Sequence, residues 1–131
     1  MAGDRPGRRS DAHPDPRRAL GAAGEAVVAA WYEAAGYEVV DRNWRCRDGE
    51  LDLVAAAPGV LVFCEVKTRR GRGFLDPAEA VTPTKQRRIR RLALRWLAEH
   101  GRRARTVRFD VASVVHEPDG APVVEVIESA F

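Results

Sequence analysis

The sequence predicts an α/β domain in which a central mixed β-sheet is flanked by helices, in the order α-β-β-β-α-β-β. Two stretches carry apolar residues at three- and four-residue steps, which is the spacing of an amphipathic helix. Short apolar runs bounded by Gly, Pro and Asp lie between and after them, as in strands joined by turns. A length of 131 residues suits one domain and leaves little room for two.

The first helix is expected to follow an N-terminal tail. Residues 1–18 are rich in Asp, Pro, Gly and Arg and show no apolar period. We therefore expect a mobile tail, followed by a single domain over residues 19–131. The apolar stripe of the helix consists of Leu20, Ala23, Val27, Trp31 and Ala34. Gly36 follows as a natural C-terminal stop.

Three strands come next along the chain. Residues 37–40 are predicted to form a strand that continues irregularly toward Trp44. A turn sequence at 47–49 leads into a second strand at 50–57, and a Pro-Gly turn at 58–59 leads into a third strand at 60–68. Because both turns are short, we expect the three strands to form an antiparallel meander.

A second helix and two further strands complete the predicted order. Thr82 and Pro83 supply an N-cap and a first-turn proline, and Gly101 closes the helix. The apolar stripe of this helix contains Ile89, Leu92, Ala93, Trp96, Leu97 and His100. Strands are expected at 106–115 and 123–127. Since strand–helix–strand crossovers are right-handed, the strands on either side of the helix should pair in parallel.

Composition excludes several classes of protein. Hydrophobic residues make up 45% of the chain and charged residues 31%, which excludes wholesale disorder. No apolar run approaches the roughly 20 residues that span a bilayer, and the N-terminus lacks the apolar stretch of a secretory signal. Cys46 and Cys64 are too few for a disulfide scaffold. We therefore expect a cytoplasmic protein with reduced thiols and no membrane partner.

The positive charge is concentrated in one part of the chain. The net charge is only +3, but from Lys67 to Arg108 there are 14 Lys/Arg and three acidic residues, a difference of +11. Such a tract indicates a polyanionic partner, and nucleic acid is the partner that we expect. The alternative is an ordinary solvated surface in an arginine-rich chain.

Carboxylates interrupt the second predicted strand. In residues 50–54, strand alternation puts Glu50 and Asp52 on one face and Leu51 and Leu53 on the other. Both this strand and the next are otherwise hydrophobic enough to be central in a sheet. Charged groups in such strands are costly unless they pair or bind an ion.

The third predicted strand adds a carboxylate and an ammonium group. Glu65 and Lys67 share one face of the strand, and a hairpin register that brings Asp52 opposite them would gather two carboxylates and one lysine. Two hard oxygen ligands suit Mg²⁺ or Mn²⁺, which activates water for phosphodiester hydrolysis. The alternative is an ordinary cross-strand ion pair.

The presence of lysine rather than arginine at position 67 favours a metal-dependent site over an ordinary ion pair. Among 22 basic residues only Lys67 and Lys85 are lysines. An ion-pair partner alone would be served as well by arginine, whose planar fork binds carboxylates bidentately. A compact ammonium fits beside a metal-bound water, and its pKa can respond to its surroundings.

These residues also carry a family resemblance. Asp52, followed on the next strand by Glu65-Val66-Lys67, resembles the PD-(D/E)xK nuclease signature, although Leu51 stands where the name of the motif has proline. With its surroundings, the chain resembles the YraN-like family of small bacterial proteins from about residue 19 to 115. The segments that carry this wider resemblance are Gly24-Glu25, Gly49-Glu50-Leu51-Asp52-Leu53, Phe63-Cys64-Glu65-Val66-Lys67-Thr68-Arg69 and Lys85-Gln86-Arg87-Arg88-Ile89.

The resemblance implies a restriction-endonuclease-like core, similar to that of archaeal Holliday junction resolvases. It implies that Asp52 and Glu65 are metal ligands and that Lys67 is the catalytic lysine. Glu25 matches a helical glutamate that completes the site in resolvase-like members, and Gln86 matches a polar residue on the following helix. The alternatives are a solvated glutamate at Glu25 and a surface residue near a helix N-terminus at Gln86.

The expected function is therefore Mg²⁺- or Mn²⁺-dependent endonucleolytic cleavage of DNA in repair or recombination. In so short a chain with no recognition helix, structure-selective cutting of branched DNA is expected, with a homodimer favoured for symmetric cuts. The arginines expected to contact backbone phosphates are Arg69, Arg70, Arg72, Arg87, Arg88 and Arg91. The alternatives are a non-catalytic nucleic-acid-binding module that serves a partner DNA-processing enzyme, and a small interaction protein.

Overall fold

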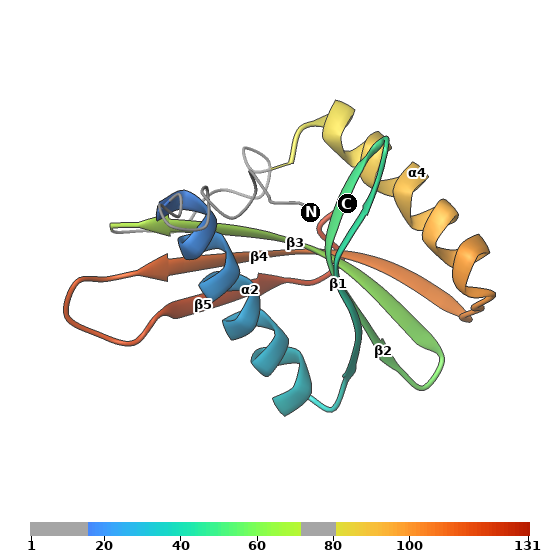
Figure 1. The fold of residues 1–131 in the computed structure, drawn as a ribbon. Coiled ribbons are helices and arrows are strands. Elements are labelled where there is room, and N and C mark those ends of the chain that lie inside the picture. Colours follow the sequence, from blue (N-terminus) through green and yellow to red (C-terminus); the bar gives the residue numbers. More distant parts are fainter. Residues whose placement is uncertain (1–15, 72–80) are drawn as a thin grey trace, which may run out of the picture.

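The computed structural model describes residues 16–71 and 81–131. Its elements are α2 (Pro16–Ala34), β1 (Glu38–Cys46), β2 (Gly49–Ala57), β3 (Val60–Arg70), α4 (Pro83–His100), β4 (Thr106–His116) and β5 (Val123–Ile127). The predicted order of helices and strands is confirmed (Figure 1). Of the tail expected at 1–18, residues 1–15 lie outside the described residues, and residues 16–18 form the first turn of α2.

The described strands form a mixed sheet in the order β1-β2-β3-β4-β5. The pairs β1/β2, β2/β3 and β4/β5 are antiparallel, whereas β3 and β4 run parallel. The parallel pairing extends from Val60 opposite Thr106 to Arg70 opposite His116, and α4 connects the two strands. This architecture is the restriction-endonuclease-like core that the resemblance implied.

The predicted irregular continuation of the first strand is confirmed. β1 runs to Cys46, and its pairing with β2 shifts register between Val39 and Asp41. Two residues later Asn43 has a left-handed backbone, with φ of 54°. A bulge of this kind bends a strand and increases its twist. The β1–β2 hairpin accordingly curves out of the sheet toward α4 (Figure 1).

Helices α2 and α4 cover opposite faces of the sheet (Figure 1). α4 has the ends that the sequence predicted. The side chain of Thr82 accepts a hydrogen bond from Lys85 N at 3.2 Å, and Gly101 ends the helix with φ of 58°. Its buried face packs on the sheet through Trp96, whose ring meets that of Phe63 edge to face at 5.6 Å.

The buried face of α2 differs from the predicted one. Val28, Ala29 and Tyr32 are buried against the sheet. The residues predicted to form the stripe are half-buried or exposed, namely Leu20, Ala23, Val27, Trp31 and Ala34. An alanine-rich helix has apolar residues on more than one side, so its period alone does not select a face. Specific contacts make the selection, among them a hydrogen bond of 2.6 Å from Tyr32 OH to Asp110 Oδ2.

Asp110 joins three parts of the fold although its side chain has no exposed surface. Besides Tyr32 of α2, it accepts two hydrogen bonds of 2.9 Å from the Arg108 guanidinium on β4. Ser129 N, in the segment after β5, donates to the same carboxylate at 3.1 Å. A buried carboxylate needs such a complete set of partners, because removing one would leave an uncompensated charge.

The side chains of β2 do not alternate between the two faces along the whole strand. Leu53 and Ala55 pack on the α2 side, and Val54 and Ala56 pack on the α4 side, as alternation requires. Leu51, however, also belongs to the α4 side. The expectation that Leu51 and Leu53 share a face is therefore wrong. The ladder between β2 and β3 ends at Leu53, and beyond that point β2 turns away.

The described residues include both cysteines and can be examined for membrane-spanning helices. Over residues 16–71 and 81–131, no helix is long and apolar enough to cross a membrane. Cys46 and Cys64 form no disulfide. Burial raises the pKa of the Cys64 thiol, so this group is protonated at neutral pH. Cys64 therefore acts as a small core residue on the α2 side.

Gly24 sets how closely α2 approaches β3, and this contact generates a prediction. A Cβ at Gly24 would collide with the side chain of Thr68, whereas a Cβ at Gly21, one turn earlier, would meet nothing within 4 Å. We expect Gly24→Ala to lower the free energy of unfolding by about 1–3 kcal/mol through overpacking. Gly21→Ala should raise it by up to about 1 kcal/mol through helix propensity. Urea unfolding of both variants measures this difference, and equal stabilisation by both would contradict the close approach.

Candidate active site

The candidate site lies where β2 leaves β3. The ladder between these strands runs from Ala57 opposite Val60 to Leu53 opposite Cys64. Val66 N, two residues beyond the end of the ladder on β3, donates instead to the side chain of Asp52, with 2.9 Å between N and Oδ2. The carboxylate thus replaces a main-chain acceptor and satisfies a half-buried backbone donor. This bond fixes Asp52 at the mouth of the gap between the two strands.

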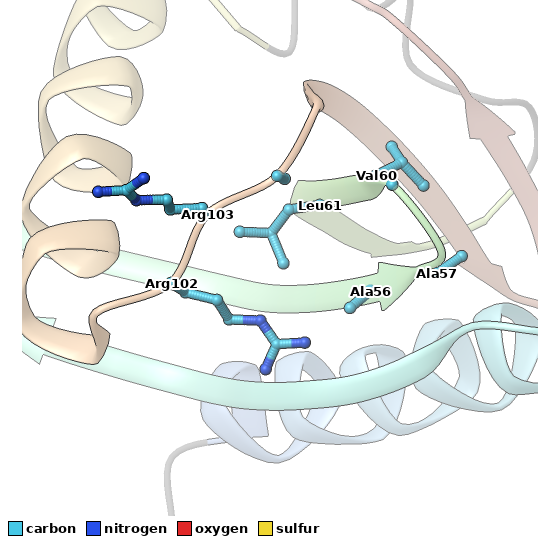
Figure 2. Close-up of a pocket in the computed structure, with 8 residues that line it drawn as sticks. Ala56, Ala57, Val60, Leu61, Arg102 and Arg103 are labelled. Atoms are coloured by element: carbon cyan, nitrogen blue, oxygen red, sulfur yellow. The ribbon is translucent and has the colours of Figure 1, made fainter.

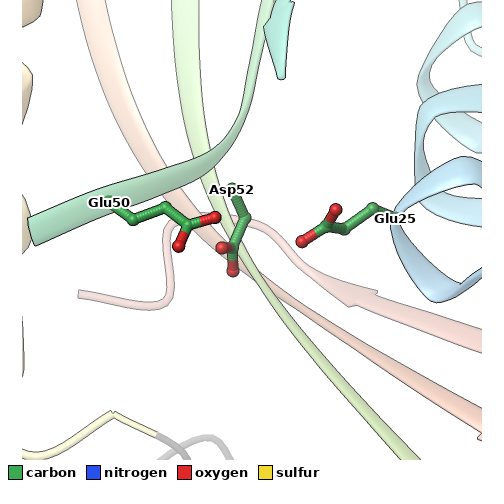
Figure 3. Close-up of side chains that lie close together, drawn as sticks. All are labelled: Glu25, Glu50 and Asp52. Carbon is green, nitrogen blue, oxygen red and sulfur yellow. The ribbon is translucent and has the colours of Figure 1, made fainter. Parts of the chain in front are cut away.

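Three carboxylates converge at this gap. Glu25 of α2 and Glu50 and Asp52 of β2 each offer an oxygen, and these oxygens all lie within 4.8 Å of one another. Figure 3 shows Glu25 approaching from the helix, opposite the two strand residues. Glu25 accepts a hydrogen bond from Asn43, the residue of β1 with the left-handed backbone. The structure therefore brings Glu25 and Asp52 together and adds Glu50 to them.

Burial and like charge perturb this cluster. Burial raises the pKa of Asp52 to about 7, and the Glu65 carboxylate adds to the rise, while the hydrogen bond from Val66 N opposes it. Burial also raises the pKa of Glu25, with the hydrogen bond from Asn43 opposing and the charge of Glu50 adding to the rise. Without a cation, the cluster is therefore under electrostatic strain that a positive ion would relieve.

Glu65 has a different environment from the other carboxylates. Its side chain is only 10% exposed, and Oε2 lies 3.3 Å from Lys67 Nζ and 2.9 Å from Lys85 Nζ. Burial lowers the pKa of Lys67, and the neighbouring positive charge of Lys85 lowers it further. Burial acts in the same direction on Lys85, but its hydrogen bond to the Glu65 carboxylate outweighs burial and leaves the pKa of Lys85 raised. The two lysines thus differ in pKa, which is lowered for Lys67 and raised for Lys85.

Asp52 and Glu65 line one cavity of about 210 Å³ between β2 and α4. Glu50, Lys85 and Arg88 line it as well. On the other side of the carboxylates, a second cavity of about 360 Å³ lies between α2 and β1. It is lined by polar residues and small residues of α2, among them Arg18, Glu25, Asn43, Arg45 and Glu50. The carboxylate cluster therefore lies between two open polar cavities.

Gln86 lies outside this arrangement. Its side-chain Nε2 donates to the carbonyl oxygen of Val81 at 3.1 Å, and its backbone N donates to the oxygen of Thr82 at 2.8 Å. Gln86 lines neither of the two cavities. The structure therefore does not bring Gln86 to the carboxylates, and its amide holds the start of α4 in place.

The arginines predicted to bind phosphate are distributed over two elements. On α4, Arg88 lines the cavity beside Asp52, whereas Arg87 donates to Thr84 Oγ1 at 3.3 Å and Arg91 is exposed. Arg69 and Arg70 end β3. Arg72 lies outside the described residues.

Four polar residues around the cluster are not among the residues that the sequence predicts for the site. Glu50 shares a predicted strand face with Asp52, and Lys85 is one of two lysines and belongs to a segment of the family resemblance, but neither is a predicted site residue. The rarity of lysine was a usable signal, since both lysines contact Glu65. Arg18 and Arg45 carried no signal, because their proximity to Glu25 and Glu50 depends on how α2 and β1 pack.

Another cavity serves as a contrast to the site. It has a volume of about 180 Å³ and lies at the β2–β3 turn, near the connection from α4 to β4. Figure 2 shows Arg102 and Arg103 beside it, together with Ala56, Val60 and Leu61. Among the described residues that line this cavity there is no carboxylate, in contrast to the site between β2 and α4.

Comparison with known proteins places these residues in a family. Residues 24–114 match the family described as Uncharacterised protein family UPF0102. The chain belongs to this family. UPF0102 proteins of high similarity include one from Beutenbergia cavernae, which is 59% identical over 107 residues, covering 82% of this chain and 91% of the relative. Another, from Nocardia farcinica, is 54% identical over 115 residues, covering 88% and 91%.

The UPF0102 match confirms the YraN-like resemblance at the level of the family. A third relative, the UPF0102 protein of Rhodococcus jostii, is 54% identical over 113 residues, covering 86% of this chain and 96% of its own. The matched region of the UPF0102 chain contains Glu25, Glu50, Asp52, Glu65, Lys67 and Lys85. The whole described carboxylate–lysine arrangement thus lies within the part of the chain that defines the family.

The raised pKa of Asp52 generates a prediction for the metal-free UPF0102 chain. A carboxyl whose pKa rises from 3.8 to about 7 on folding contributes stability below pH 4 that is lost as pH rises through 7. Asp52→Asn should therefore have a higher Tm than the wild type at pH 8 in EDTA, and the difference should vanish near pH 4. Thermal unfolding across pH 4–8.5 measures this difference.

The matched control for this measurement is Asp48→Asn. The Asp48 side chain is 68% exposed in the β1–β2 turn, so its replacement should give no comparable gain in Tm at high pH. Wild-type and Asp52→Asn curves that run parallel from pH 4 to pH 8.5 would contradict the electrostatic strain.

Proposed function

We propose that the protein is a Mg²⁺- or Mn²⁺-dependent endonuclease that hydrolyses DNA phosphodiester bonds, with selectivity for branched structures. The observation that carries the proposal is the convergence of Glu25, Glu50 and Asp52 beside a buried carboxylate with two lysines. A protein that only binds nucleic acid gains nothing from carboxylates gathered against its substrate, because they repel phosphate.

The donor set fits a small hard cation. Carboxylate oxygens are the preferred protein ligands of Mg²⁺, which binds them at about 2.1 Å, so oxygens on opposite sides of the ion lie about 4.2 Å apart. Oxygens already within 4.8 Å of one another need only a small movement to share one ion. Asp52 is the central ligand in this proposal, with Glu25 and Glu50 beside it and Glu65 across the shared cavity.

In the proposed mechanism the carboxylates hold the metal ion, and the basic side chains contact the attacking water and the phosphates. A bound divalent ion would supply Lewis acidity and lower the pKa of a coordinated water. Lys67, held on Glu65 and partly buried, orients the attacking water or neutralises the scissile phosphate. Arg88 faces the same cavity and holds a neighbouring phosphate. These contacts address the sugar–phosphate backbone and read no base, which supports selection by DNA structure.

Cleavage assays on branched and linear DNA test the proposal. With Mg²⁺ or Mn²⁺ the wild type should cut, and excess EDTA should abolish cutting. Asp52→Asn should lower the single-turnover rate at least ~100-fold, since losing metal-assisted stabilisation of several kcal/mol costs a factor of ten per 1.36 kcal/mol. DNA binding should persist in that variant.

Asp48→Asn is again the matched control and should cut at the wild-type rate, because Asp48 lies in an exposed turn. Cleavage that survives EDTA would contradict the metal-dependent mechanism. Tight binding of the same DNA with no cleavage by the wild type would favour the binding module that serves a partner enzyme.

The salt dependence of DNA binding locates the interface. Each phosphate neutralised contributes about −0.9 to the slope of log K against log salt concentration. Replacing Arg87, Arg88 and Arg91 together by Ala should flatten the slope by about two to three units without changing sequence preference. Replacing Arg102 and Arg103, at the far cavity, should leave it unchanged (Figure 2). A slope that flattens only when Arg102 and Arg103 are replaced would place the DNA interface at the C-terminal end of α4.

A further inference from the structure

Both lysines of the chain contact the same oxygen atom. Lys67 Nζ and Lys85 Nζ lie 3.3 Å and 2.9 Å from Glu65 Oε2, although they come from β3 and α4. One ammonium group is enough to neutralise one carboxylate. The second brings another positive charge to a carboxylate whose side chain is only 10% exposed, and there the two ammonium groups repel each other. Two ammonium groups on one carboxylate oxygen therefore call for an explanation beyond a simple ion pair.

The residue type at position 85 is unusual for this chain and for this helix. Twenty of the 22 basic residues are arginines, and α4 itself carries Arg87, Arg88, Arg90, Arg91 and Arg95. A permanent ion pair with Glu65 would be made at least as well by a guanidinium, which holds a carboxylate through two parallel hydrogen bonds. An ammonium on a flexible four-carbon stem is held less rigidly and can exchange partners.

We propose that Lys85 is an exchangeable counter-ion of Glu65, which it leaves for a substrate phosphate when Glu65 becomes a cation ligand. The inference rests on the proposed function and names a second lysine for the same site. Lys85 occupies the carboxylate oxygen while no cation is bound and thereby offsets the cost of burying Glu65. Once released, its ammonium group binds the phosphate of DNA in the cavity.

The positions of the two lysines decide which of them exchanges. Lys67 is two residues from Glu65 on the same strand face, so the pairing of β3 with β4 holds both together. Lys85 reaches Glu65 from the first turn of α4, and it lines the cavity that Asp52 and Arg88 also line. A swing of the Lys85 side chain within this cavity is enough to transfer it from Glu65 to a phosphate held by Arg88.

Three variants test the exchange. Lys85→Met removes the ammonium group and keeps the length of the side chain, and Lys85→Arg keeps a positive charge that holds Glu65 more firmly. Arg95→Met is the matched control, because Arg95 also lies on α4 and makes ion pairs, but with Glu99 and Asp48. The first measurement is Mn²⁺ affinity without DNA, by electron paramagnetic resonance. The second is single-turnover cleavage at saturating Mn²⁺, with Tm recorded for each variant.

The expected results separate exchange from a fixed ion pair. Lys85→Met should bind Mn²⁺ at least ~10-fold more tightly than the wild type, because a competing cation has left Glu65, yet cleave at least ~10-fold more slowly. Lys85→Arg should bind Mn²⁺ more weakly and also cleave slowly. Arg95→Met should match the wild type in both. A merely structural lysine would change the Tm and leave Mn²⁺ affinity unmoved.

Failure of this inference is distinguishable from failure of the proposed function. Equal Mn²⁺ affinity of the wild type, Lys85→Met and Lys85→Arg, with cleavage by the wild type, overturns the exchange and leaves the nuclease proposal standing. If Lys85→Met does not fold, the comparison of Lys85→Arg with the wild type decides in the same way. A wild type that neither binds Mn²⁺ nor cleaves DNA overturns both.

Discussion

The hydrogen bond from Val66 N to Asp52 Oδ2 marks the point where β2 leaves β3, and the candidate site depends on that departure. Strands that stayed paired would use this N–H in the ladder and would leave no gap between them. Because β2 turns away, its two carboxylates face Glu25 of α2 while Glu65 stays in the centre of the sheet. The parallel strands supply a rigid frame, and the gap supplies the space for a ligand.

Most of the fold was predictable because residues close together in the sequence determine where its helices and strands begin and end. Thr82 and Gly101 bound α4 through side-chain and backbone preferences that act within a few residues. The short turns of the meander likewise leave few topologies open. The buried face of α2 was not predictable in this way. Val28 and Tyr32 face the sheet because of partners on β3 and β4, which lie far away in the sequence.

The candidate site was predictable to the extent that single strands reveal it. Charged residues in apolar strands singled out Asp52, Glu65 and Lys67, and the structure gives each a charged or polar partner in the gap. The contribution of Glu50 depends on the curvature of β2, and that of Lys85 on the distance from α4 to β3. The spacing of residues within one helix or strand cannot predict these distances, because they arise from packing between elements.

The central parallel pair has a consequence for synthesis of the chain. Val60 of β3 pairs with Thr106 of β4, so the two partners are separated by a crossover that includes all of α4. A ribosome translates β3 well before β4, and until β4 emerges one edge of β3 has no neighbour. During that interval the nascent chain exposes an apolar strand edge that also carries Glu65 and Lys67. These charges discourage pairing of that edge with other chains, so the residues proposed to act on DNA also protect the unfinished sheet.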